Sequence, residues 1–242
     1  MENRVSSSGA GTLEVELIEL SDKDPAVLIG EGLREAGKRR GARTRHPLES
    51  VMKAFRKHLG TSRGDRFSRG VAACLTDADP RVRAQALLFF EAFPEASGAE
   101  LLVTLARSRR NLFAGVPNPF APSLDLEWQL LRSIGARILR RDRDALAFGY
   151  SCAVEPGHAQ PIIAALTFTD PDWVVAHAEA IVSANPGVAG TLLNSLQRSA
   201  HDVGAVGARI APLAARDPKF QETLELLILE EGTRRRIFDA MH

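Results

Sequence analysis

The chain has 242 residues, of which 45% are hydrophobic and 25% are charged, and its formal net charge is +1. This balance is ordinary for a globular protein of one or two domains with a sizeable core. Only 6% of the residues are aromatic, and alanine, leucine and valine supply most of the apolar content, which favours closely packed helices over an all-β fold. The two cysteines, Cys74 and Cys152, are too few for a disulfide framework or a metal site, so we expect reduced thiols.

The first 23 residues are a predicted tail or arm in front of a helical domain that spans residues 24–242. Residues 1–12 are small and polar. Residues 13–20, LEVELIEL, alternate apolar and acidic side chains as a strand does, but the leucines would also line one face of a helix. As a strand this segment would be able to pair with a partner chain, and as a helix or arm it would pack on its own domain. Both interpretations remain open.

A basic segment covers residues 34–70 and holds twelve lysines or arginines against three acids, a net charge of +9. Residues 1–33 carry a net charge of −5, so the nearly neutral whole hides this segment. Clustered cations attract both phosphates and acidic protein segments. A solvated loop and helix face, rich in arginine because of a GC-rich genome, would explain the same charges. The expected partner contacts in this segment are Arg39, Arg40, Arg43, Arg45, Lys53, Arg56 and Lys57.

Three helices are predicted before the middle of the chain, beginning at Asp24, Pro47 and Ser62. The first is weakened by two internal glycines. The apolar face of the second is formed by Leu48, Val51, Met52, Phe55 and Leu59. The apolar face of the third is formed by Phe67, Val71, Cys74 and Leu75.

Residues 79–108 have the pattern of a complete helix–turn–helix unit. Asp79 is placed to cap a helix, and Pro80 occupies the first helical position, where a missing N–H costs nothing. The buried face is predicted to comprise Val82, Ala86, Phe89, Phe90 and Phe93, with Arg83 and Gln85 off that face. A second helix with Leu101, Leu102 and Leu105 follows the turn. It ends in a basic run of Arg107, Arg109 and Arg110, which suits the carbonyl end of a helix.

An irregular loop covers residues 111–123, where three prolines forbid a regular helix. Loops of this length are longer than usual and often functional. Its phenylalanines would either anchor a partner or fold back over the helices. With the preceding basic run, this loop adds Arg107, Arg110, Phe113 and Phe120 to the expected partner contacts.

The helix–turn–helix pattern recurs along the chain. Residues 170–199 repeat it from Asp170-Pro171 onward. Between these two copies a helix begins at Ser123 or Asp125, and a further helix begins at Asp217-Pro218. The starts at 79, 125, 170 and 217 are 46, 45 and 47 residues apart. This pattern, over residues 47–242, resembles the HEAT and armadillo class of α-helical repeats, and the resemblance implies a right-handed α-solenoid. Two-helix and three-helix pairings both stay open, as does an irregular all-α domain with independent Asp-Pro caps.

The sequence holds few patterns that indicate chemistry. The six histidines are scattered with no i, i+4 pair, and no phosphate-binding glycine loop or nucleophile elbow is present, so we expect no metal and no cofactor. A second basic cluster, Arg137, Arg140, Arg141 and Arg143, is interleaved with two aspartates, which predicts internal ion pairs. With no apolar run of membrane-spanning length and no signal peptide, we expect a cytoplasmic protein.

Two functions fit these observations. The first is a non-enzymatic scaffold or adaptor that binds a protein partner through its helical surface, as the resemblance implies, with an acidic partner as one alternative. The second is a nucleic-acid-acting HEAT-like protein of the alkylpurine DNA glycosylase type, in which aromatic residues and a carboxylate meet on a basic face. Trp128, Trp173 and Asp170 are available for that role, although we expect both tryptophans to pack in the core, and no stretch matches the active-site pattern of that family. HEAT-type bilin lyases find no specific support.

Overall fold

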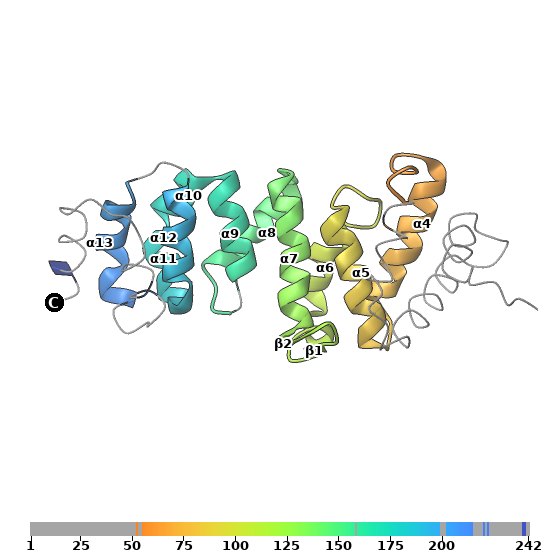
Figure 1. Cartoon of the computed structure of the whole chain (residues 1–242), viewed down its shortest axis with the longest axis horizontal. Helices are drawn as coiled ribbons and strands as arrows, with labels where there is room; N and C mark the ends of the chain where they lie inside the picture. The colour runs from red at the N-terminus through yellow and green to blue at the C-terminus, as the bar shows by residue number, and fades with distance from the viewer. Residues whose placement is uncertain are drawn as a thin grey trace, which may run out of the picture. The chain divides into compact units, whose positions relative to one another are not determined.

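The computed structural model describes Met52, residues 55–157, 159–198 and 202–214, and the single residues Phe220, Glu222, Asp239 and Ala240. Helices account for 73% of these residues, in ten α-helices accompanied by one short hairpin (Figure 1). The predicted helical class is therefore confirmed, and the hairpin is an addition to it. The arm at 13–20, the helix from Asp24, most of the basic segment and the helix from Asp217 lie outside the described residues.

The chain divides into two compact units, unit 1 (Met1–Ser133) and unit 2 (Ile134–His242), and the division falls inside helix α7. Among the described residues of unit 1, the helices before α7 are α4 (Ser62–Ala73), α5 (Pro80–Ala92) and α6 (Leu101–Ser108), with single 3-10 turns at η1 (Cys74–Thr76) and η2 (Arg110–Leu112). The predicted starts at Ser62 and Asp79 are confirmed. The Asp79 carboxylate accepts a hydrogen bond from the amide of Arg81 at 2.8 Å, and Pro80 takes the first helical position.

A cluster of phenylalanine rings forms the core of unit 1. Phe89 lies at its centre, with ring centroids 4.8–5.9 Å from those of Phe55, Phe67, Phe90 and Phe93. All five rings are buried. The predicted inner faces of α4 and α5 are thus confirmed, and these rings fix how the two helices face one another.

Burial of α5 extends further round the helix than its sequence predicts. Arg83 and Gln85, expected off the buried face, are only 7% and 1% exposed. The helix is covered by α4 and η1 and by the hairpin, and the hydroxyl of Ser133 donates to the carbonyl of Leu87 at 2.9 Å. Arg83 donates to the carbonyl oxygens of Asp77 and Ala78 at 2.6 and 3.1 Å, while burial lowers the pKa of its guanidinium. The expectation that Arg83 and Gln85 lie on an outer face was wrong, because neighbours distant in sequence cover that face.

The predicted irregular loop contains an antiparallel hairpin of β1 (Pro117–Asn118) and β2 (Ala121–Asp125). The side chain of Asn118 accepts a hydrogen bond from the amide of Phe120 at 2.9 Å, which closes the turn as asparagine commonly does. Helix α7 (Leu126–Leu139) follows directly. Its cap is Asp125, which accepts from the amide of Trp128 at 2.9 Å, whereas the alternative start, Ser123, lies within β2.

Unit 2 contains the rest of α7 and a series of short helices (Figure 1). Helix α9 packs against α8, α10 and α12, and α13 packs against α11 and α12. The first helix of the repeat that is expected from Asp170 is broken at His177, whose backbone leaves the helical conformation. The bounds are α8 (Arg143–Ala153), α9 (Gln160–Thr169), α10 (Pro171–Ala176), α11 (Ala178–Ala184), η3 (Pro186–Val188), α12 (Ala189–Gln197) and α13 (Val203–Ala214).

Candidate functional site: an arginine surface on α4

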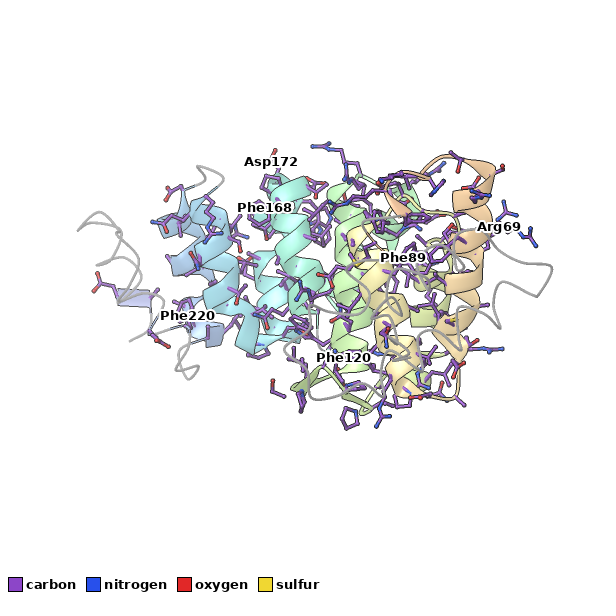
Figure 2. The ribbon with its side chains drawn as sticks, turned by 45° about the vertical axis from the view of Figure 1, so that its right-hand side comes forward. Arg69, Phe89, Phe120, Phe168, Asp172 and Phe220 are labelled. Carbon is purple, nitrogen blue, oxygen red and sulfur yellow. The ribbon has the colours of Figure 1, made fainter. Side chains whose placement is uncertain are left out.

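The described part of the basic segment forms one cationic surface, here called the α4 surface. Its side chains come from α4 and from the turn in front of it, and all are exposed: Arg56, Lys57, Arg63, Arg66 and Arg69. Residues three apart in a helix are neighbours on its surface, so the three arginines of α4 follow one another along one side. Figure 2 shows Arg69 pointing outward from unit 1, away from Phe89 in the core.

The buried side of α4 explains why these cations face outward. Phe67 and Val71 are 2% exposed, and the Phe67 ring lies 5.6 Å from Phe55 and 5.9 Å from Phe89. Ser68 and Gly70 are buried on the same side, whereas Arg63, Arg66 and Arg69 are exposed on the other side of the helix. Burial of Phe67 thus sets the rotation of α4 and, with it, the direction of Arg63, Arg66 and Arg69.

The turn that carries Arg56 and Lys57 is tied to the start of α4. The Thr61 hydroxyl donates to the carbonyl of His58 at 2.6 Å and accepts from the amide of Gly64 at 3.1 Å. The guanidinium of Arg56 lies 6.0 Å from the centre of the Phe93 ring, within reach of a cation–π interaction. The turn and the helix therefore present their cations as one surface.

The cations of the α4 surface form no ion pair within the described residues. There, the side chains of Arg63, Arg66 and Arg69 form no ion pair or hydrogen bond. Asp65, the single acid of α4, instead accepts a hydrogen bond from the Ser97 hydroxyl at 2.7 Å. Elsewhere arginines do meet acids, as in the pairs Arg110–Glu127, Arg132–Glu91, Arg137–Asp142 and Arg209–Glu179.

The residues predicted to contact a partner do not gather at one place. Arg39, Arg40, Arg43, Arg45 and Lys53 lie outside the described residues, and Arg56 and Lys57 belong to the α4 surface. The remaining four belong to the end of α6, to η2 and to the hairpin segment. Figure 1 shows the hairpin and the turn that precedes α4 at opposite ends of unit 1. The members of this second group are Arg107, Arg110, Phe113 and Phe120.

Members of the second group differ in their accessibility. Arg107 is exposed, and the Phe120 side chain is 42% exposed. Arg110 is exposed too, but it forms an ion pair with the buried Glu127. Phe113 is fully buried, which agrees with the alternative that the loop folds back over the helices. Its side chain cannot reach a partner in this conformation.

Unit 2 holds a cluster of aromatic side chains around Asp170. The Tyr150 hydroxyl donates to one carboxylate oxygen of Asp170 at 2.7 Å, and the other oxygen caps α10 at the amide of Trp173, 3.2 Å away. The Trp173 ring lies 4.6 Å from Tyr150 and stacks on His177 at 4.2 Å. The hydrogen bond to Asp170, followed by burial, raises the pKa of Tyr150. Both oxygens of Asp170 are therefore engaged in holding the fold.

The second basic cluster contains the internal ion pair that its sequence predicts. Arg137 donates to Asp142 at 2.6 Å, and the other oxygen of Asp142 caps α8 at the amide of Ala145. Burial by itself would raise the pKa of Asp142, but the amide of Ala145 and the guanidinium of Arg137 lower it. This ion pair links the end of α7 to the start of α8.

Arg63, Arg66 and Arg69 were counted in the charge of the basic segment but were not among the expected contacts. Their spacing of three, with Phe67 and Val71 on the other side, was a signal that helical periodicity could have found. In the described part of the chain, no three histidine, cysteine, aspartate or glutamate side chains gather closely enough to hold a metal ion. No described helix is both long and apolar enough to cross a bilayer.

Comparison of the chain with models of protein families, with curated proteins and with solved structures finds no match. The class of the protein therefore follows from its own fold, which is helical.

Proposed function

We propose that the chain is a non-enzymatic interaction module, built as a HEAT-like or armadillo-like α-solenoid, which binds an acidic segment of a protein partner through the α4 surface. The regular spacing of the capped helix starts and the packing of successive short helices on one another support the repeat architecture. The α4 surface supports the binding function. The observation that carries the proposal is its row of three exposed arginines, whose side chains form no ion pair or hydrogen bond among the described residues.

Such a row is unfavourable for the isolated chain. Like charges one turn apart in a helix destabilise it by about 0.2–0.5 kcal/mol per pair. Carboxylates of a partner would remove this repulsion and would make charge-assisted hydrogen bonds with the guanidinium groups. A partner helix with acidic residues three apart would match the spacing of Arg63, Arg66 and Arg69.

The surroundings of the α4 surface favour a protein over a nucleic acid. Proteins that bind single strands combine cations with exposed aromatic rings on which bases stack. The rings beside the α4 surface, Phe55, Phe67 and Phe93, are at most 3% exposed and pack in the core. A nucleic acid would therefore be held only by the attraction of the cations to its phosphates, which is sensitive to salt and independent of sequence.

Charge reversal on the α4 surface tests the proposal. The probes are a fluorescein-labelled helical peptide with glutamates at i, i+3 and i+6, and fluorescein-labelled single-stranded and duplex DNA. Three exposed ion pairs at about 0.5 kcal/mol each correspond to about tenfold in affinity. We therefore expect R63E/R66E/R69E to weaken peptide binding by about this factor or more.

The matched control is R81E/R140E/R198E, which changes the net charge equally at three exposed arginines elsewhere. We expect it to change peptide affinity by less than about twofold, because the proposed contact does not involve these positions and salt largely screens exposed charges that are not in contact. Equal losses in the two triple variants would show a non-specific charge effect and would contradict the proposal. Absence of peptide binding to the unmodified chain, or tighter binding of either DNA at about 200 mM salt, would also overturn it.

A further inference from the structure

The hairpin of unit 1 is fastened to the helices at its base. The carbonyl of Val116 accepts from the amide of Leu126 at 2.8 Å, and the carbonyl of Phe113 accepts from the amide of Glu127 at 3.2 Å. Across the base, the amide of Gly115 donates to the carboxylate of Asp125 at 3.2 Å. These bonds join the hairpin directly to the first turn of α7.

Buried side chains hold the same segment from inside. Phe113 is fully buried, and Glu127, 4% exposed, pairs with Arg110 in η2. At the tip, Asn118 is 3% exposed and accepts from the amide of Phe120 at 2.9 Å. Fixed φ angles at the prolines of the segment further restrict its backbone. The hairpin therefore presents its tip in a predetermined conformation, which reduces the entropy that is lost on binding.

Phe120 is the apolar side chain that this tip exposes. It is 42% exposed, whereas the other described phenylalanines of unit 1 are buried in the core. Figure 2 shows Phe120 at the hairpin end of the unit, apart from Phe89. Prolines at 117, 119 and 122 remove backbone donors from both strands, which disfavours pairing of the hairpin with a strand of another protein. Recognition by the side chain remains as the available mode.

The charges of the segment that carries Phe120 indicate the chemistry of a partner. Residues 101–124 carry no acid, and their three charged side chains are the exposed Arg107, Arg109 and Arg110. Acidic neighbours at the base of the hairpin are engaged: Asp125 caps α7, and Glu127 pairs with Arg110. A segment with an exposed apolar side chain and cations but no acid is complementary to an apolar pocket rimmed by carboxylates.

We propose that residues 113–125 are a docking element that inserts Phe120 into an apolar pocket of a protein partner, with acidic residues at the rim of that pocket facing Arg107 and Arg109. This contact uses none of the residues of the α4 surface. Its failure would therefore leave the function proposed for the α4 surface intact, and the converse also holds.

Site-specific photocrosslinking in the full-length chain locates the pocket. A benzophenone amino acid replaces Phe120 in one variant and Phe168, a 55% exposed phenylalanine of unit 2, in the control. We expect the label at 120, and not the label at 168, to crosslink to one protein, with the crosslinked peptide in an apolar pocket rimmed by aspartate or glutamate. Crosslinks to a second copy of this chain alone, or equal products from both positions, would overturn the proposal.

The crosslinked protein is then purified and titrated with unlabelled variants of the full chain. Phe120→Ala should weaken binding about tenfold or more, as truncation of a central anchor commonly does, and Phe120→Leu should retain most of the affinity. R107E/R109E should weaken binding, and raised salt should lessen the difference from the unmodified chain. Unfolding curves identify any variant with altered stability. An unchanged affinity of a folded Phe120→Ala variant would contradict the insertion of this side chain.

Discussion

Replacing Gly64 with alanine should destabilise unit 1, although alanine is the better helix former. An alanine Cβ at this position of α4 would lie 2.8 Å from the carbonyl carbon of His58 and would overlap its oxygen. Ordinary contacts between carbon atoms are about 3.5–4.0 Å, and the obstacle here is backbone, which cannot rotate away. The turn would have to move, and both hydrogen bonds of the Thr61 hydroxyl depend on its position.

Opposing effects determine the magnitude at Gly64. Helix propensity alone predicts that Gly→Ala raises the free energy of unfolding by about 1 kcal/mol. Loss of the Thr61 cap costs about 1 kcal/mol, and overpacking against His58 costs about 1–3 kcal/mol. We therefore expect a net loss of about 1–3 kcal/mol. The sign of the change separates the two explanations, because propensity and crowding predict opposite directions.

Urea unfolding measures this change. The chain has two tryptophans, Trp128 in unit 1 and Trp173 in unit 2, so Trp128 fluorescence in a Trp173→Phe background reports on unit 1. Gly60→Asn is the control in the same turn, because its φ of +75° is accessible to asparagine and nothing lies within 4 Å of an added Cβ. The free energy of unfolding of this control variant should stay close to that of the parent. A Gly64→Ala variant as stable as the parent, or more stable, would refute the proposed crowding.

Three further outcomes are expected. Tyr150 is the only tyrosine, so absorbance titration should give a pKa above the ordinary value of about 10, and Asp170→Asn should lower it. Its contribution to stability is fully present below pH ~10 and is lost as pH rises through the folded pKa; an unshifted titration would contradict the bond to Asp170. Phe89→Ala should cost about 3–5 kcal/mol in urea unfolding, because four rings surround this side chain, and a loss below about 1 kcal/mol would contradict that packing. The Glu179–Arg209 pair is exposed, so Glu179→Gln should cost less than about 1 kcal/mol, with the largest effect at low salt. Arg209 lowers the pKa of Glu179, so the contribution of the pair is lost as pH falls through that pKa, and a loss that salt does not reduce would argue against an ion pair.

Local signals in the sequence were sufficient for many helix boundaries. Asp79, Asp125 and Asp170 cap helices because a short side chain reaches the first amides, a contact that needs only neighbouring residues. The spacing of the phenylalanines likewise predicted the inner face of α5. Both features depend on residues within one or two turns, so a single sequence carries them.

Contacts between segments that are distant in the chain could not be predicted from the sequence. Nothing near Arg83 and Gln85 indicates burial on a second face, since the covering elements include Ser133, 46 residues beyond its partner Leu87. The hairpin depends on an asparagine turn and on bonds from its base to α7, while its prolines predicted only that helix is absent. The break at His177 likewise interrupts a pattern that is continuous in the sequence.

The same distinction applies to the candidate site. Charge is a local property, so the basic segment could be identified from composition. Whether a given arginine meets an acid depends on the fold: Glu127 reaches Arg110 over 17 residues, and Glu91 reaches Arg132 over 41. The spacing of Arg63, Arg66 and Arg69 was visible in the sequence, but only the structure shows that these side chains form no ion pair among the described residues.

The two proposed contacts of unit 1 should act on different steps of association if one partner engages both. Exposed ion pairs contribute little to affinity but accelerate encounter, so R63E/R66E/R69E should chiefly lower the association rate, and salt should reduce the difference from the parent. A buried aromatic anchor acts after encounter, so Phe120→Ala should chiefly raise the dissociation rate. Stopped-flow kinetics with the crosslinked partner separates the two rates. Changes in association rate alone for both variants would mean that Phe120 is not buried in the complex, whereas the expected division would give the α4 surface the role of steering and the hairpin the role of retention.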